Sequence, residues 1–323
     1  MRIIDRLSRQ FAADEAHQRC TVARNSNDSR ILRRLYINGV LVRPYYRMYA
    51  RAEYWKSLDP RAQMQHMVIT AQAMHPSWVF ARESAACMFP SEQSFGIYAP
   101  QELVIMSKLP PQTNDHKNLH RLPWESSQII TIDNVRVTSS TRTLFDCGMK
   151  FAFEHTLPLF DSFVQHGVDL DRVRDICVTA KEDTSRIQRL IEFTDPLAEN
   201  GGESRARAVI IDSGFMPPIL QHQFVNPRNP RAPLRSDFLW YGPNGAVIVG
   251  EYDGMGKYGT EYSQISEHVA RQAARDKILM EQGVTAIVHF TYTDVVNPER
   301  LRAKLEAAGV PYRGSADNRG STY

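Results

Sequence analysis

The chain has 323 residues, which is more than one domain of typical size requires. Hydrophobic residues make up 42% and charged residues 23%, a composition that argues against a largely disordered chain. No apolar stretch approaches the roughly 18 residues needed to cross a bilayer, and the first residues lack the pattern of a secretory signal. The four cysteines form no CxxC pair, which argues against a thiolate zinc site. We therefore expect a cytoplasmic protein that has no membrane partner.

Positive charge is concentrated in the first fifth of the chain. Residues 1–60 carry 12 Lys+Arg against 6 Asp+Glu, so the remaining residues together carry −3 of the overall +3. A basic segment on a mildly acidic body is typical of a small nucleic-acid-binding module joined to a larger body. The alternative is a solvated arginine-rich surface.

Residues 1–59 have the pattern of a winged-helix DNA-binding domain. Apolar spacing predicts one helix over 3–11 and a second helix that follows the N-cap cluster 25–28. Residues 40–49 are β-branched and aromatic with a proline break, which predicts a hairpin. The second helix would be the recognition helix and the hairpin the wing. The alternative is a structural cap with surface arginines. The expected DNA contacts are Arg30, Arg33, Arg34, Arg43 and Arg47.

Residues 60–195 are predicted to form a mixed α/β middle region. The expected elements are a helix at 60–74, strands at 103–107 and 129–138, and mostly helix over 151–191. Residues 194–202 contain a proline and a Gly-Gly pair, which break the pattern and predict a linker.

Residues 196–312 are predicted to form a mixed sheet flanked by helices. The order of elements is α-β-β-β-α-β, so the expected class is α/β, or α+β for the chain as a whole. Residues 313–323 have little to bury and are expected to be disordered. The expected elements are helix 203–213, strands 219–225, 236–241 and 246–252, helix 265–282, strand 285–292 and helix 298–308.

Three acidic residues lie on two neighbouring strands of this last region. If residues 243–245 form a three-residue loop, Asp237 faces Glu251 directly and Asp253 joins the same face. A two-residue loop would put Glu251 on the opposite face. Carboxylates held this close repel one another unless a cation lies between them, and Mg²⁺ or Mn²⁺ is the natural partner of such oxygens.

Further charged residues surround these strands. Glu203 opens the preceding helix, where it would either join the acids or pair with Arg207 as an ordinary helix residue. Acids that hold a metal and cations that offset phosphoryl charge are what phosphodiester hydrolysis requires. The alternative for the helix cations is a solvated face. The candidate cations are Lys257, Arg271, Arg275 and Lys277.

This arrangement resembles the PD-(D/E)XK nuclease fold, and most of all its very-short-patch-repair-endonuclease-like branch, whose second strand often ends in Glu-x-Asp-Gly. Over roughly residues 1–312 the chain resembles actinobacterial proteins that join an AbiEi-type antitoxin domain to such a nuclease-like domain. The resemblance rests on the order of the matching stretches along the chain more than on any single stretch. The matching stretches are 39–43, 84–86, 137–146, 202–205, 237–238, 251–254 and 257–258.

The resemblance implies a metal-dependent endonuclease that acts on double-stranded DNA, with Glu203, Asp237 and Glu251 as ligands of Mg²⁺ or Mn²⁺. The usual pattern has a lysine two residues after the strand acid, and here that residue is Asp253. Either another cation substitutes, Asp253 is itself a ligand, or the site is degenerate. The implied catalytic residues are Asp237, Glu251, Asp253, Lys257 and Lys277. The alternative function is an antitoxin-like transcriptional regulator, with a cognate toxin protein as a further candidate partner.

Overall fold

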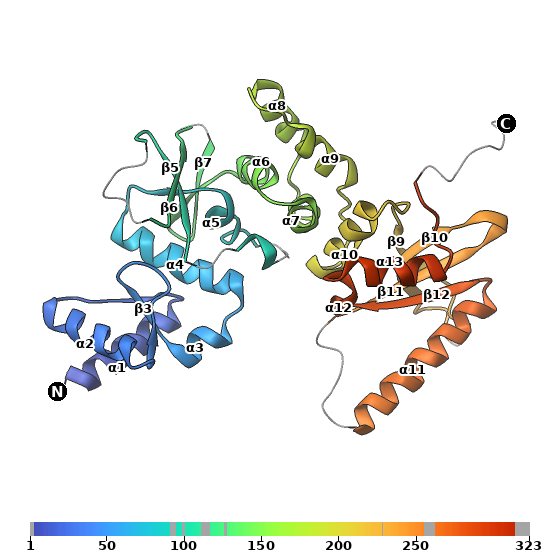
Figure 1. Cartoon of the computed structure of the whole chain (residues 1–323), viewed down its shortest axis with the longest axis horizontal. Coiled ribbons are helices and arrows are strands. Elements are labelled where there is room, and N and C mark those ends of the chain that lie inside the picture. The colour runs from blue at the N-terminus through green and yellow to red at the C-terminus, as the bar shows by residue number, and fades with distance from the viewer. Residues whose placement is uncertain are drawn as a thin grey trace. The chain divides into compact units, whose positions relative to one another are not determined.

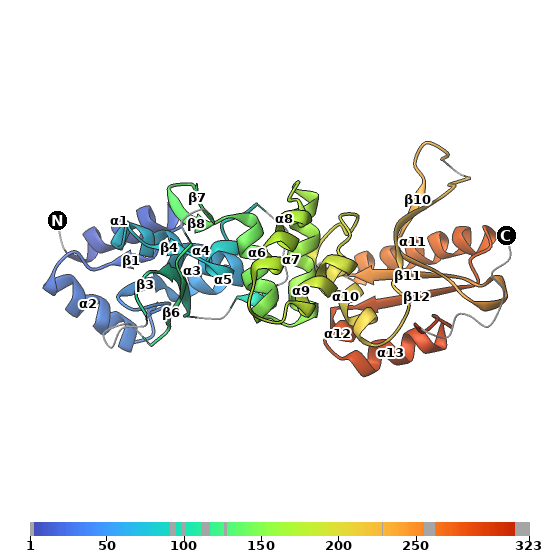
Figure 2. The same cartoon turned by 90° about the horizontal axis from the view of Figure 1, so that it is seen from above.

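The computed structural model of the chain describes residues 3–90, 95–98, 101–110, 117–125, 128–227, 229–254 and 262–313. These residues gather into two compact units (Figure 1, Figure 2). The first unit draws its residues from 3–90, 95–152 and 167–192, and the second from 153–166 and 193–313. Both units combine helices with β-sheets, so the predicted α/β class is confirmed. Within the described ranges, no helix is long and apolar enough to cross a membrane.

The first unit begins with two helices and a small sheet. The elements are α1 (Ile3–Ala16), β1 (Thr21–Val22), α2 (Ser26–Ile37), β2 (Leu41–Val42) and β3 (Met48–Arg51). Asn25 caps α2, because its side chain accepts the backbone N–H of Asp28 at 2.9 Å. The sheet order is β1-β3-β2. The expected helices and hairpin are present, and β1 is an additional strand that the sequence did not indicate.

The rest of the first unit is built on a five-stranded mixed sheet. Its elements are α3 (Ala52–Ser57), α4 (Pro60–Met74), β4 (Val79–Phe80), α5 (Arg82–Ala86), β5 (Leu103–Ser107), β6 (Leu119–Pro123), β7 (Ile129–Ile132), β8 (Val135–Thr138), α6 (Ser140–Lys150), α8 (Leu170–Thr179) and α9 (Ser185–Phe193). The strand order is β6-β5-β4-β8-β7. Residues 129–138, expected to be extended throughout, form a hairpin. It turns at Asp133 and Asn134, whose φ angles are 47° and 64°.

The second unit is built on a four-stranded sheet. Its elements are α7 (Phe153–Gln165), α10 (Gly201–Asp212), β9 (Ile219–Phe224), β10 (Leu234–Tyr241), β11 (Val247–Asp253), α11 (Tyr262–Glu281), β12 (Ala286–Thr291), α12 (Tyr292–Val295) and α13 (Pro298–Ala307). The strand order is β12-β11-β10-β9, with β11 and β12 parallel and the other pairs antiparallel. The predicted α-β-β-β-α-β order is therefore confirmed from α10 to β12.

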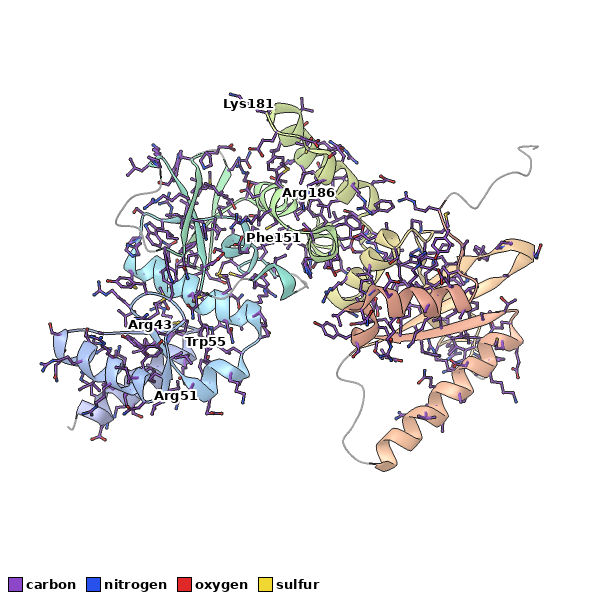
Figure 3. All side chains as sticks on the ribbon, in the orientation of Figure 1. Arg43, Arg51, Trp55, Phe151, Lys181 and Arg186 are labelled. Atoms are coloured by element: carbon purple, nitrogen blue, oxygen red, sulfur yellow. The ribbon has the colours of Figure 1, made fainter. Side chains whose placement is uncertain are left out.

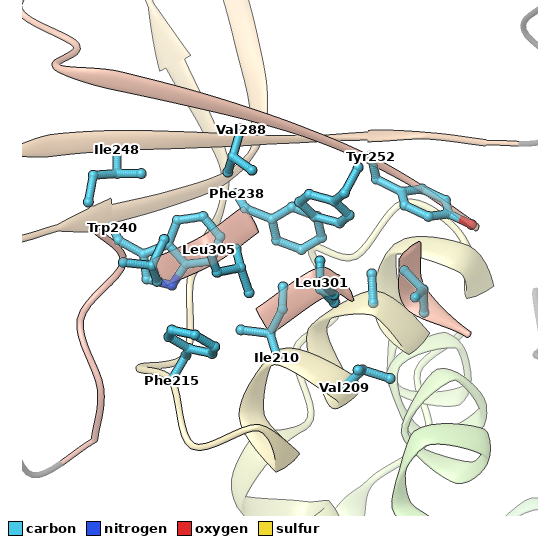
Figure 4. Close-up of a cluster of buried hydrophobic side chains, with 14 of the residues drawn as sticks. Val209, Ile210, Phe215, Phe238, Trp240, Ile248, Tyr252, Val288, Leu301 and Leu305 are labelled. Atoms are coloured by element: carbon cyan, nitrogen blue, oxygen red, sulfur yellow. The ribbon is translucent and has the colours of Figure 1, made fainter. Parts of the chain in front are cut away.

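Helices cover both faces of this sheet. On one face, side chains of α10 and α13 pack against residues of all four strands in a single buried cluster (Figure 4). On the other face, Leu239 and Val249 pack against Leu279 near the end of α11. Alternate strand residues thus serve opposite cores, as the period of two requires. The first cluster includes Val209, Ile210, Phe238, Trp240, Ile248, Val288, Leu301 and Leu305.

The loop between β10 and β11 sets the register of this hairpin. Residues 243–245 form the loop, which ends in a left-handed glycine with a φ angle of +80°. Phe238 pairs with Gly250, so the next position along the ladder brings Asp237 opposite Glu251. The predicted three-residue loop is confirmed, and the two acids share one face of the sheet.

A buried ion pair attaches α7 to the second unit, although α6 and α8 belong to the first. Nη2 of Arg207 lies 2.7 Å from both carboxylate oxygens of Asp161, and both side chains are buried. Asp161 also accepts the N–H of Asp195 at 2.9 Å, and Arg207 donates to the carbonyl of Phe193 at 2.5 Å. Residues 194–202, expected to be a linker, are therefore anchored to α7 and α10. The predicted domain boundary at residue 59 stays a prediction.

We expect Asp161→Ala to lower the free energy of unfolding by about 3–5 kcal/mol, because the substitution leaves a buried guanidinium without its carboxylate. Urea unfolding followed by circular dichroism measures the loss. The double variant Asp161→Leu/Arg207→Met removes both charges and should recover most of it. If the double variant is as unstable as the single one, the unpaired charge is not the cause.

Candidate functional site

Five acidic residues line one cavity of the second unit, the exposed Glu199 and four that the sequence singled out. Glu203 comes from the first turn of α10, Asp237 from β10, and Glu251 and Asp253 from β11. The cavity has a volume of about 760 Å³. The acids that the sequence singled out as candidate metal ligands or catalytic groups are therefore brought together.

Glu203 reaches this cavity because Gly202 lets α10 approach the sheet closely. A Cβ atom at position 202 would lie 2.7 Å from Cε1 of Tyr252, a distance too short for any side chain. Asn200 caps the helix by accepting the N–H groups of Gly202 at 2.9 Å and Glu203 at 3.0 Å. Arg207, considered above as a partner of Glu203, pairs with the carboxylate on α7 instead. Gly202 therefore serves a contact between α10 and β11, where the sequence indicated a linker.

The Glu203 carboxylate is a weaker acid than usual. Burial first, and then the negative charge of Asp237, raise its pKa from 4.5 to about 7. Its oxygens accept hydrogen bonds from the N–H of Glu199 at 3.1 Å, from Asn200 at 2.6 Å and from Gln221 at 3.1 Å. These donors offset only part of the cost of burial, so the carboxylate takes up a proton near neutral pH.

Glu251 is partly neutralised by an arginine from α11. Nη2 of Arg275 lies 3.0 Å from Oε1 of Glu251, and the same group donates to the carbonyl of Arg235. Burial raises the pKa of Glu251, the charge of Arg275 opposes this rise, and the charge of Asp237 adds to it. The carboxylate of Asp237 is held by the N–H of Tyr252 at 2.8 Å. Asp237 therefore acts electrostatically on both glutamates of the cavity.

A histidine that the sequence analysis did not single out also lines the cavity. His289 lies on β12, which runs parallel to the acidic strand β11. Its Nδ1 is 2.7 Å from Nε2 of Gln272, and its Nε2 is 3.0 Å from Oδ2 of Asp276. Because the amide nitrogen of Gln272 can only donate, the ring proton belongs on Nε2 and is donated to Asp276. A signal for this residue existed, since it is a lone histidine in an otherwise apolar strand.

The candidate cations do not all reach the cavity. Lys277 is exposed on α11 and does not line the cavity, so its predicted catalytic role has no support from its position. Lys257 lies outside the described residues. The cations that line the cavity are Arg235, Arg271 and Arg275.

The acids suit a hard divalent cation by their chemistry, because Mg²⁺ and Mn²⁺ prefer carboxylate oxygens. The raised pKa values of Glu203 and Glu251 are partly due to the neighbouring negative charge of Asp237, which a cation would offset. As the described part of the chain is arranged, however, no group of three or more His, Cys, Asp or Glu side chains is placed to hold a metal ion. The three predicted metal ligands therefore stay a prediction.

The first unit exposes the arginines that were predicted to contact DNA. Arg30, Arg33 and Arg34 lie on one face of α2, spaced three and four residues apart. Arg43 and Arg47 belong to the segment that joins β2 to β3, and the Arg43 guanidinium lies 5.3 Å from the centre of the Tyr36 ring. All five side chains are exposed, as phosphate contacts would need.

No protein-family model, no curated protein and no solved structure matches the chain. The resemblance to AbiEi-type antitoxins and to the very-short-patch-repair-endonuclease-like branch therefore stays a prediction. A function has to be inferred from the residues themselves.

We expect Glu203→Gln to stabilise the protein at pH 8 and to have little effect at pH 4.5, in chelator-containing buffer. Glu203 has a pKa of about 7 in the folded protein against an ordinary value of 4.5. Between these values the unfolded chain releases the proton while the folded protein retains it, so wild-type stability falls as pH rises through this window. The free energy of unfolding that Glu203→Gln gains over the wild type should therefore grow from pH 4.5 to 7 and then level off, at about 3 kcal/mol or less.

Thermal and urea unfolding from pH 4.5 to 8 measure this effect. Glu281→Gln is the matched control, since Glu281 is an exposed glutamate at the end of α11 that does not line the cavity. Parallel stability curves for wild type and Glu203→Gln across the whole range would contradict the prediction.

Proposed function

We propose that the second unit hydrolyses phosphodiester bonds in DNA with the help of a divalent cation, Mg²⁺ or Mn²⁺, and that residues 1–59 deliver it to double-stranded DNA. The observation that supports this most directly is the meeting of five carboxylates and three arginines in one cavity. Acids that hold a cation and guanidinium groups that bind phosphate oxygens are the two requirements of this chemistry.

Asp237 and Glu251 would hold the cation, with Glu203 or Asp253 completing the set. The cation would supply an activated water and offset charge on the phosphate. Arg275 currently occupies an oxygen of Glu251, so it would have to exchange that carboxylate for a phosphate oxygen when the site is loaded. The buried Glu203, which takes up a proton near neutral pH, would be the acid whose charge responds most to the cation.

The first unit would supply attraction to the DNA backbone. The arginines on α2 and on the β2–β3 hairpin form an exposed basic surface, which suits a helix in the major groove with a wing beside it. Phosphate contacts of this kind position a protein on the duplex without reading its sequence.

A second candidate function is a DNA-binding regulator of the antitoxin type whose second unit does not cleave. Its candidate protein partner is a cognate toxin. Two observations favour it. The carboxylates of Glu203, Asp237 and Glu251 are each already engaged by donors within the protein. The position where the nuclease pattern has lysine holds Asp253, a buried acid.

We expect the wild-type protein to bind Mn²⁺ in calorimetric titration and to relax supercoiled plasmid in the presence of Mg²⁺ or Mn²⁺. Asp237→Asn should abolish both, because it removes the charge that acts on both glutamates of the cavity. Its stability should be unchanged or higher, since asparagine still accepts the N–H of Tyr252 and no longer repels the neighbouring acids.

The control for this experiment is Glu281→Gln, which removes an exposed negative charge at the end of α11 in the same unit. It should bind Mn²⁺ and relax plasmid as the wild type does. Absence of heat and of cleavage in a folded wild-type protein would eliminate the nuclease function and leave the regulator.

We expect the triple variant Arg30→Gln/Arg33→Gln/Arg34→Gln to bind duplex DNA more weakly and with a flatter salt dependence. Loss of three phosphate contacts should reduce the slope of log K against log salt by about 2.7, at about 0.9 per contact. Fluorescence anisotropy at several salt concentrations measures both quantities. The control replaces three exposed cations of the same unit, Arg172, Arg174 and Lys181, with glutamine. An unchanged slope in the α2 variant, or an equal change in the control, would contradict the assignment.

A further inference from the structure

A second cavity lies in the first unit, beside the elements that carry the predicted DNA contacts. It has a volume of about 430 Å³, within the range of small-molecule sites. Its lining includes Tyr36 at the end of α2 and Arg43 after β2. It also includes Trp55 of α3 and two methionines of α4. Figure 3 labels Arg43 and Trp55 in the first unit.

The lining is apolar at its base and carries one charge. Met64, Met67 and Tyr98 are buried beneath the cavity. Methionine side chains adapt their shape to a ligand, and aromatic rings offer flat faces for stacking. Among the lining residues that the structure describes, Arg43 is the only one that carries a full charge at neutral pH, and its side chain is exposed.

The residues that line this cavity are held in place by contacts with one another and with neighbouring residues. Nε2 of Gln63 donates to the carbonyl of Trp55 at 2.9 Å and to that of Leu58 at 3.2 Å, which fixes α3 against α4. The Trp55 ring meets the ring of His66 edge to face, with centroids 6.2 Å apart. The space is therefore bounded by positioned side chains.

We propose that this cavity binds a small aromatic monocarboxylate. The ring of the ligand fills the space over the methionines beside Trp55 and Tyr36, and its carboxylate pairs with Arg43. One positive charge at an apolar, aromatic cavity selects a flat apolar body with a single negative charge. A dianion would leave a second negative charge unpaired against this lining.

Ligand binding and DNA binding are coupled at this site, a step that rests on the proposed function. Arg43 is one of the predicted phosphate contacts, and Tyr36 closes the recognition helix α2. A carboxylate on Arg43 removes that charge from the DNA surface, so the ligand weakens DNA binding and DNA weakens ligand binding by the same factor.

The test uses the full chain, with 1-naphthoate as the probe and the neutral 1-naphthamide as its matched partner, in calorimetric titration without DNA. The wild type should bind naphthoate at least about tenfold more tightly than naphthamide, the difference expected of one charge-assisted contact. Arg43→Gln should abolish that preference while leaving naphthamide binding unchanged. Arg9→Gln, which removes an exposed charge on α1 away from the cavity, should leave the preference intact.

A cavity-filling variant, Met67→Phe, should lose both probes, with circular dichroism and thermal unfolding as the check on its fold. Binding of neither probe at millimolar concentration, equal affinity for the two, or equal losses in Arg43→Gln and Arg9→Gln would overturn the proposal. Should Met67→Phe not fold, the comparison of Arg43→Gln with Arg9→Gln decides alone. A DNA titration with and without naphthoate then tests the coupling. DNA binding that is equal with and without naphthoate would overturn the coupling through Arg43. Absence of DNA binding with intact probe binding would count against the DNA function and not against the ligand site.

Discussion

The antiparallel register of β10 and β11 is the constraint on which the acidic cavity depends. A three-residue loop brings Asp237 opposite Glu251, and a shift by one residue would send Glu251 into the opposite core. Gly250 secures this register, because a Cβ atom there would lie 2.9 Å from the Trp240 ring. The same strand pair therefore supplies both buried aromatic packing in the core of the second unit and the acids at its end. A substitution that disturbs this aromatic packing would therefore also displace the acids.

The acids of the cavity are retained at a cost in folding free energy. Burial and mutual repulsion raise the pKa values of Glu203 and Glu251, whereas an ordinary structural carboxylate would be expected to have a lowered one. Burial raises the pKa of Asp161 as well, but there the charge of Arg207 opposes the rise, whereas the charge of Asp237 adds to it at both glutamates of the cavity. Groups that are strained in this way, and gathered in a cavity, are typical of functional sites. This contrast is why the cavity, and not the buried ion pair, carries the proposed function.

Local signals in the sequence were sufficient for much of this fold, and long-range contacts were not. The order from α10 to β12 followed from periodicity, and the loop 243–245 from its proline and glycine, so the shared face of Asp237 and Glu251 was predictable. Gly202 was misassigned to a linker because the contact that requires a glycine there is with a tyrosine ring 50 residues further along the chain. His289 was missed for a similar reason, since its partners Gln272 and Asp276 lie on a different element. The resemblance to a nuclease family stays a prediction, because no family model, curated protein or solved structure matches the chain.

The charge distribution makes the two halves of the proposed function depend on each other. An acidic cavity repels a DNA phosphate unless a cation is present, and the arginines inside it are partly engaged, as Arg275 is by Glu251. Attraction to DNA must then come from elsewhere in the chain, and residues 1–60 hold the surplus of positive charge. A protein with only the basic surface would bind DNA without cleaving it, and one with only the acidic cavity would not approach it. Binding of the carboxylate ligand at Arg43 would therefore regulate the binding of DNA without contacting the acids of the cavity that would cleave the DNA.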